Sequence, residues 1–85
     1  MELKFHRDYA VVKLSQIARA FKEGEVVTPQ TLLDRKVIND IKDGVRITAK
    51  GEIGFGVRVR VHKVEREARR KILEAGGEVE EIKET

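Results

Sequence analysis

Hydrophobic and polar residues alternate most regularly near the middle of the second half of the chain. Three valines there alternate with three basic side chains: Val57, Val59, Val61, Arg58, Arg60 and His62. Because consecutive side chains of a strand point to opposite faces, this pattern predicts a strand with one buried face. Its other face, which carries Arg58, Arg60 and His62, is predicted to meet solvent or a ligand.

A helix is predicted directly after this strand, over residues 65–75. Val64, Ala68, Ile72 and Ala75 recur at helical spacing, and the glycine pair at 76–77 supplies the left-handed residue that ends many helices. A final strand is predicted over residues 78–82. A strand, a helix and a strand in so short a segment predict a βαβ unit with parallel strands.

The first half of the chain shows the same theme with shorter elements. We predict a strand at 9–12, a helix at 15–22, a strand at 25–27, a helix from 29 to about 35, and a strand at 45–48. Ser15 and Thr28 are the predicted N-caps, and Pro29 suits a first helical residue. Gly51 predicts a turn, and Gly54–Gly56 a second break or bulge. The fold class is therefore mixed α/β.

Composition limits the architecture to one small domain. The chain has 85 residues and no cysteine, so we expect a single core held by packing and hydrogen bonds, without disulfides or thiolate metal sites. No apolar run approaches the roughly 20 residues that cross a bilayer. We therefore expect a soluble intracellular domain with no membrane partner, and its charged fraction of 39% predicts a heavily ionic surface.

Charge is unevenly distributed although the total is only +3. Residues 57–71 contain seven cations and two anions, a balance of +5, whereas residues 72–85 contain five glutamates and one lysine, a balance of −4. A polyphosphate backbone is one natural counter-surface for such a basic block. The alternative is that glutamates of this chain neutralise the block as an ionic surface network. Charge alone leaves both interpretations open.

Catalytic and metal-binding motifs are sparse. His6, Asp8 and His62 lack the spacing of a metal site and the setting of an acid–base pair. Gly51, Gly54 and the glycine at 56 lie between two predicted strands, whereas a phosphate-binding loop lies between a strand and a helix. We therefore predict no enzyme, no metal, no cofactor and no small-molecule substrate.

Four segments together resemble a known family: YAVVKLSQIARAFKEGEVVTPQTLLDRKVI, GVRITAKGEI, VRVRVHK and EARRKILEAGGEVEEI. They are similar to the C-terminal globular domain of large-subunit ribosomal protein L-fifteen, and more remotely to its relative L-eighteen-e. The most diagnostic order is Arg46, Ile47, Ala49, Gly51, Ile53, Val57, Val59, Val64, Ala68, Ile72 and Gly76. The segment VTPQTLL also resembles the VTPE segment usual in that family.

The resemblance implies an irregular superhelix of strand-strand-helix units that ends in the βαβ unit. It also implies a structural constituent of the large ribosomal subunit, beside ribosomal RNA and neighbouring ribosomal proteins, in a cytoplasmic ribosome with an organellar one left open. The family usually has serine or threonine where Glu65 stands and an aliphatic residue where Thr48 stands. Its Gly- and Arg-rich N-terminal extension is absent, so we expect residues 1–85 to form one globular domain without it.

The signature and the basic block together predict the residues that contact RNA. These are Lys4, Arg7, Arg58, Arg60, Lys63, Arg66, Arg69 and Arg70. With only four aromatic residues, the contacts are expected to reach phosphate and RNA shape rather than stacked bases. The alternative is a protein-interaction or structural module that pairs through a strand edge or the acidic tail.

Overall fold

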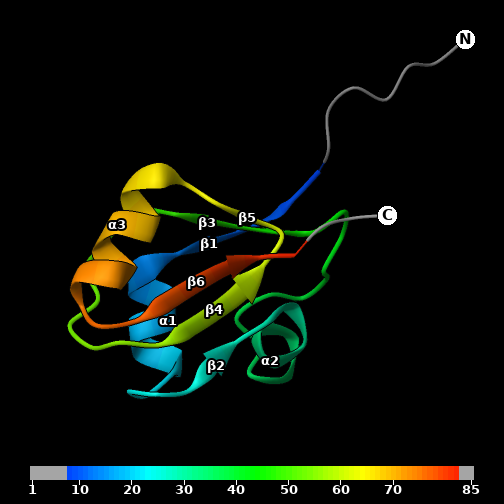
Figure 1. Ribbon diagram of the computed structural model, residues 1–85. Coiled ribbons are helices and arrows are strands. Elements are labelled where there is room, and N and C mark those ends of the chain that lie inside the picture. The colour runs from blue at the N-terminus through cyan, green and yellow to red at the C-terminus, as the bar shows by residue number, and fades with distance from the viewer. Residues whose placement is uncertain (1–7, 83–85) are drawn as a thin grey trace, which may run out of the picture.

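The computed structural model describes residues 8–82, which form two parallel sheets and three helices (Figure 1). In chain order the elements are β1 (Ala10–Lys13), α1 (Leu14–Ala20), β2 (Val26–Val27), α2 (Pro29–Asp34), β3 (Val45–Thr48), β4 (Arg58–Val61), β5 (Lys63–Val64), α3 (Arg66–Glu74) and β6 (Glu78–Glu81).

Successive strands alternate between the two sheets. The first sheet has the order β1-β3-β5 and the second the order β2-β4-β6, with every neighbouring pair parallel. Within each sheet, therefore, every new strand pairs with the strand of that sheet that precedes it in sequence. In Figure 1 the first sheet lies above the second, α3 lies at the left and α2 at the lower right. This winding confirms the predicted α/β superhelix.

The C-terminal unit has the predicted parallel strands. β4 pairs with β6 in a register that places Arg58 beside Glu78 and Val59 beside Val79. One element was not predicted: β5 lies between β4 and α3, and its Val64 pairs with Ile47 of the first sheet. Residues 58–64 therefore contribute one strand to each sheet before α3 begins.

The two predicted N-caps had different outcomes. Thr28 caps α2 as predicted, because its hydroxyl accepts a hydrogen bond from the Thr31 N–H at 3.1 Å. Ser15 is not the N-cap of α1, so that prediction is wrong: Lys13 occupies the position, and its N–H donates to the Gln16 side chain at 2.9 Å. The acceptor at this helix start is therefore a side chain inside the first turn.

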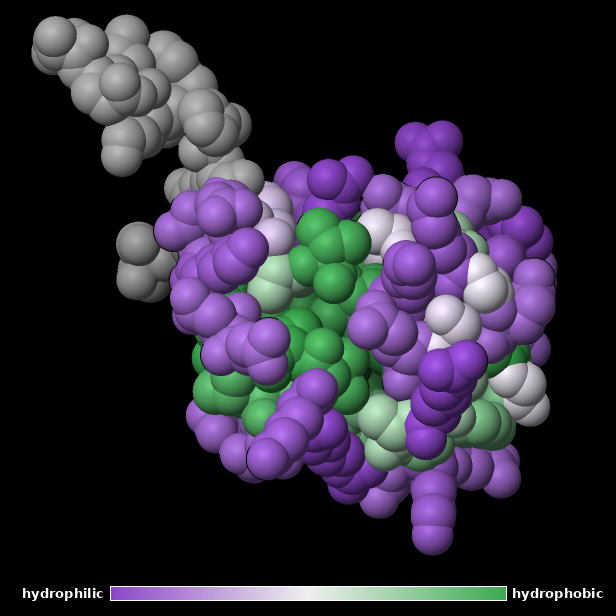
Figure 2. Space-filling model, turned by 180° about the vertical axis from the view of Figure 1, so that it is seen from behind, coloured by the Kyte–Doolittle hydropathy of each residue, from purple (hydrophilic) through white to green (hydrophobic). Residues whose placement is uncertain are grey.

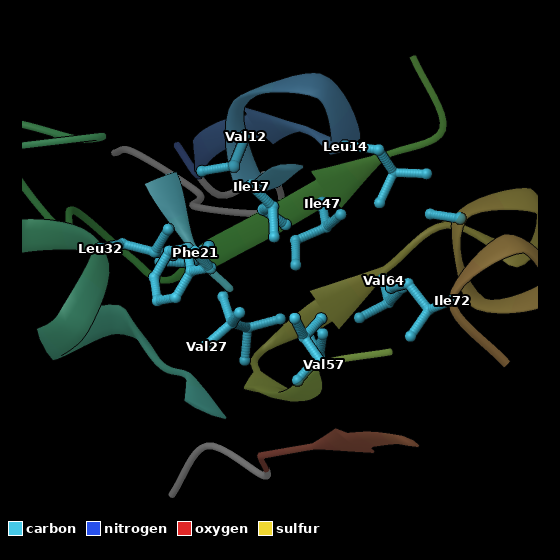
Figure 3. Packing of buried hydrophobic residues seen from close by; sticks show 14 of the residues in the cluster. Val12, Leu14, Ile17, Phe21, Val27, Leu32, Ile47, Val57, Val64 and Ile72 are labelled. Carbon is cyan, nitrogen blue, oxygen red and sulfur yellow. The ribbon is translucent and has the colours of Figure 1, made fainter. Parts of the chain in front are cut away.

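The core lies between the two sheets, and the buried residues of the described chain are all apolar. The valines of β4 and the valine that precedes it are buried while Arg58 and Arg60 are exposed, which confirms the predicted alternation. Ala68 and Ile72 of α3 are buried as well. Figure 3 shows Phe21 beside Leu32 at one end of this core and Ile72 at the other.

Two glycines allow the chain to pack backbone against backbone where the strands of the second sheet begin. A Cβ atom on Gly56 would lie 2.6 Å from the carbonyl oxygen of Gly76. A Cβ atom on Gly77 would overlap the carbonyl oxygen of Val57, which accepts the N–H of Glu78 at 3.0 Å. Gly56, at the end of the predicted break, is thus a site of close approach, where a side chain would force β4 and β6 apart.

Alanine at residue 77 is expected to lower the free energy of unfolding by about 1–3 kcal/mol, because the added methyl group overpacks this contact. Gly54→Ala is the matched control, since nothing lies within 4 Å of its would-be Cβ. It should leave stability unchanged or raise it by up to about 1 kcal/mol. Urea unfolding of both variants checks this, and equal midpoints would contradict the close-approach argument.

Thr48 of β3 has a buried hydroxyl with no hydrogen-bond partner among the described residues. Thr48→Val replaces that hydroxyl with a methyl group of similar size, so we expect the free energy of unfolding to rise by about 1 kcal/mol. Thr31→Val is the control and should have the opposite sign, because the Thr31 hydroxyl accepts from the Thr28 N–H at 2.8 Å. Thermal melting of both variants would refute the account if Thr48→Val were the less stable one.

An ion pair joins Glu25, the residue before β2, to Arg35, the residue after α2. Arg35 Nη1 lies 2.7 Å from Glu25 Oε1 and also donates to the Ala20 carbonyl at 2.8 Å. The guanidinium lies over the Phe21 ring, 4.4 Å from its centre. Hydrogen bonds from Arg35 and from the Lys22 N–H lower the pKa of Glu25 from 4.5 to about 2. The contacts of Glu25 and Arg35 therefore link the end of α1, the residue before β2 and the end of α2.

A depressed pKa predicts the pH range in which Glu25 contributes to stability. The contribution is fully present above pH 4.5, the ordinary pKa, and is lost as the pH falls through about 2. Melting temperatures measured from pH 6 to 1.5 should fall less steeply for Glu25→Gln than for the unmodified chain. Glu23→Gln, a change at an exposed neighbouring carboxylate, should keep the original pH dependence; the same flattening in both variants would count against the ion pair.

Candidate nucleic-acid interface

Six of the eight residues predicted to contact RNA lie in the described part of the chain. Lys4 and Arg7 lie outside it. The six come from the second sheet, β5 and α3: Arg58, Arg60, Lys63, Arg66, Arg69 and Arg70. Their surroundings divide them into cations that face a carboxylate and cations that do not.

The outer face of β2-β4-β6, which we call the second-sheet face, carries equal numbers of opposite charges. Arg58 lies 3.7 Å from Glu78, and Arg60 lies 3.1 Å from Glu80. Both contacts follow from the register of β4 with β6, which places each arginine directly beside its glutamate. The side chains of Arg58 and Arg60 nevertheless remain 65% and 57% exposed. The two glutamates therefore neutralise the charge of these arginines but leave their side chains accessible to solvent.

The arginines of α3 also face carboxylates. Arg70 Nε lies 2.8 Å from Glu67 and its Nη1 lies 3.0 Å from Glu74, and these hydrogen bonds raise the pKa of Arg70. Arg69 lies 3.4 Å from Glu81 of β6. The glutamate network proposed as the alternative to RNA therefore exists around four of the six predicted cations, as a set of exposed pairs.

Lys63 and Arg66 are different, because neither forms an ion pair with any residue between 8 and 82. Both side chains are exposed. Lys63 stands on β5 directly beside Arg46 of β3, so two like charges are neighbours across these strands. Such a pair is destabilising unless an anion lies near it.

Two cations that were not predicted to contact RNA, Lys13 and Arg46, lie on the same sheet surface as Lys63. The outer face of β1-β3-β5, which we call the first-sheet face, carries Lys13, Arg46 and Lys63, because Val12, Ile47 and Val64 fill the inner face in register. The alternation of residues 45–48 places Arg46 on the outer face of a strand. The neighbours of that strand could not be read from the sequence.

One glutamate lies beside this face, and it is shared. Glu65 lies 2.8 Å from Arg46 Nη2 and also accepts the Ala49 N–H at 3.3 Å. It forms no side-chain cap on α3, even though it occupies the N-cap position. The three cations of the first-sheet face and this one carboxylate leave a balance of +2, whereas Arg58, Arg60, Glu78 and Glu80 on the second-sheet face balance to zero.

His62 does not share a surface with Arg58 and Arg60, so that part of the strand prediction is wrong. β4 ends at Val61, and the half-buried His62 ring accepts the Val45 N–H at its Nδ1, at 3.0 Å. The ring also fills the space beside Gly44, where a Cβ atom would lie 2.9 Å from it. His62 therefore joins the segment after β4 to the start of β3.

The described residues form no metal cluster, and the groove on the second-sheet face is small. No group of three histidine, aspartate or glutamate side chains is placed to hold a metal ion there. The groove between β4 and β6 measures about 220 Å³, below the roughly 300–1,000 Å³ of ordinary ligand pockets. No helix in this part of the chain is long and apolar enough to cross a membrane.

The surface is not uniformly ionic. Figure 2 shows hydrophobic surface in the middle of the face opposite to that of Figure 1, surrounded by hydrophilic side chains. Among large apolar residues of the described chain, Val11 is 55% and Leu73 50% exposed. Val11 lies beside Arg46 in the register of β1 and β3. The surface is therefore ionic over most of the molecule, as predicted, but apolar at Val11 and Leu73.

Comparison with known proteins identifies the family of this small parallel α/β domain. A family profile that covers the ribosomal proteins 50S-L15 and 50S-L18e, together with a 60S relative, matches residues 11–80. The chain belongs to this ribosomal protein family, as the four segments of the sequence predicted.

Curated relatives carry the name "Large ribosomal subunit protein uL15". The protein of Kosmotoga olearia is 41% identical over 76 residues, which are 89% of this chain and 51% of the relative. Those of Fervidobacterium nodosum and Thermotoga petrophila are 42% and 40% identical over 74 residues, 87% of this chain and 50% of each relative. The chain thus spans about half the length of the curated relatives it matches.

Proposed function

We propose that this chain is a structural constituent of the large ribosomal subunit that binds ribosomal RNA through its basic strand-helix surface. The observation that carries the proposal is membership of the ribosomal protein family over residues 11–80. Relatives that are 40–42% identical and named as large-subunit proteins support it. The role is that of a scaffold without catalysis, in the cytoplasmic ribosome or its organellar counterpart, beside ribosomal RNA and neighbouring ribosomal proteins.

The proposed contact residues are the cations predicted from the sequence. Those in the described chain are Arg58, Arg60, Lys63, Arg66, Arg69 and Arg70, and the N-terminal segment adds Lys4 and Arg7. Exposed ion pairs contribute little stability, so an arginine can leave its glutamate for a phosphate at small cost. Each phosphate contact releases condensed counterions, which makes binding favourable and salt-dependent.

Base stacking has little support in the described chain. Phe21 is buried in the core, and Tyr9 and Phe55 are half-buried. A single-strand-binding sheet instead presents aromatic side chains on its open face. The open faces here present charged and aliphatic residues. We therefore expect recognition of the phosphate backbone and of the shape of folded RNA.

The test is a binding titration with a transcript of bacterial large-subunit ribosomal RNA, over about 50–200 mM salt. We expect affinity to fall as salt rises, and the double variant Lys63→Glu with Arg66→Glu to bind at least tenfold more weakly. The control Arg19→Glu with Lys36→Glu makes the same charge change at exposed cations outside the predicted set and should bind within about threefold of the unmodified chain.

Two results would overturn the proposal. One is salt-independent or absent binding by the unmodified chain. The other is an equal loss of affinity in both double variants, which would show that net charge alone matters. A stable dimer on size-exclusion chromatography that is indifferent to added RNA would favour the protein-interaction alternative instead.

A further inference from the structure

The two open sheet faces differ in how much charge they can offer to an anion. On the second-sheet face, Glu78 and Glu80 already stand beside the arginines of β4. A phosphate that approached these arginines would have to displace a carboxylate and would then lie next to it. The gain in binding at each contact is reduced by that repulsion.

On the first-sheet face, fewer carboxylates of the described chain compete with an anion for the cations. Lys13 and Lys63 have no ion-pair partner within residues 8–82, and Arg46 shares one glutamate with a backbone N–H. Adjacent strands lie about 4.8 Å apart. The neighbouring side chains of Arg46 and Lys63 are thus close enough for both head groups to reach one phosphate.

Neighbouring residues keep this face open and extend its positive charge. Val11 is 55% exposed beside Arg46, so no other element of the described chain covers this part of the sheet. Arg66 is exposed on the first turn of α3, three residues after Lys63. The positive surface therefore continues from the sheet onto the helix.

We propose that the phosphate backbone of folded RNA binds first on the first-sheet face, with Lys13 and Arg46 as contact residues beside Lys63. This inference rests on the proposed function, narrows its surface, and adds two residues that the basic block did not include. Arg58 and Arg60 then contribute less to affinity than the cations of the first-sheet face, because Glu78 and Glu80 compete with phosphate for them.

The test compares variants of the two faces in the same RNA titration. Lys13→Gln with Arg46→Gln should lower affinity at least tenfold and reduce the slope of log K against log salt by about 1.5–2, since two phosphate contacts are lost. Lys13→Gln alone, at a side chain without an ion-pair partner in the described chain, should reduce the slope by about half as much. Circular dichroism verifies that each variant is folded.

The matched control removes the charges of the second-sheet face together. In the quadruple variant Arg58→Gln, Arg60→Gln, Glu78→Gln and Glu80→Gln, no glutamate is left without its partner and the net charge is unchanged. We expect it to lose less affinity than Lys13→Gln with Arg46→Gln, and its salt slope to remain steeper than that of this double variant.

Loss of affinity in the quadruple variant, with normal binding by Lys13→Gln and Arg46→Gln, would overturn the inference and leave the proposed function standing. Absent or salt-independent binding by the unmodified chain would overturn both. Competition by poly-L-glutamate as effective as that by RNA of equal charge would assign the first-sheet face to acidic proteins, which also contradicts the inference.

Discussion

The close approach of backbone at Gly56 and Gly77 is the constraint on which the rest of this structure depends. The glycine pair that ends α3 lies against the segment that enters β4, and the Glu78 N–H then donates to the Val57 carbonyl. That contact fixes where β6 begins relative to β4. A slip of one residue would turn every side chain of β6 to the other face. The glycines therefore determine which glutamate stands beside which arginine.

The division of charge follows from that register. Because β6 is acidic and β4 is basic, parallel pairing in this register produces a ladder of opposite charges that balances to zero. Among residues 8–82 the first sheet ends at the short strand β5, so no acidic strand of this part of the chain pairs beyond Lys63. The chain thus has two open sheets of similar architecture, of which one is neutralised internally and one retains positive charge.

The sequence predicted most of the features whose signal was local. The alternation at 57–61, the cap at Thr28 and the glycine end of α3 depend on neighbours in the chain, and all three are confirmed. The start of α1 was misplaced because Ser15 and Gln16 can both supply an acceptor, and only the folded backbone decides between them.

The candidate site was less predictable, because it depends on contacts between distant segments. The charge balance of residues 57–71 correctly indicated a basic block, but it could not show that β6 lies beside β4 with its glutamates in register. Arg46 is 17 residues from Lys63 in sequence and adjacent to it in space. The alternation predicted that His62 lies on the surface with Arg58 and Arg60. In the structure β4 ends at Val61, and the His62 ring accepts the Val45 N–H.

Amide chemical shifts recorded while RNA is added test the central claim most directly, because they report on both faces of one unmodified chain. With a transcript of large-subunit ribosomal RNA as the ligand, the account predicts the largest changes at Lys13, Arg46 and Lys63. Changes at Arg58 and Arg60 should be small, with the β4–β6 ladder intact. Large changes at Arg58 and Arg60, with an unperturbed first sheet, would contradict it.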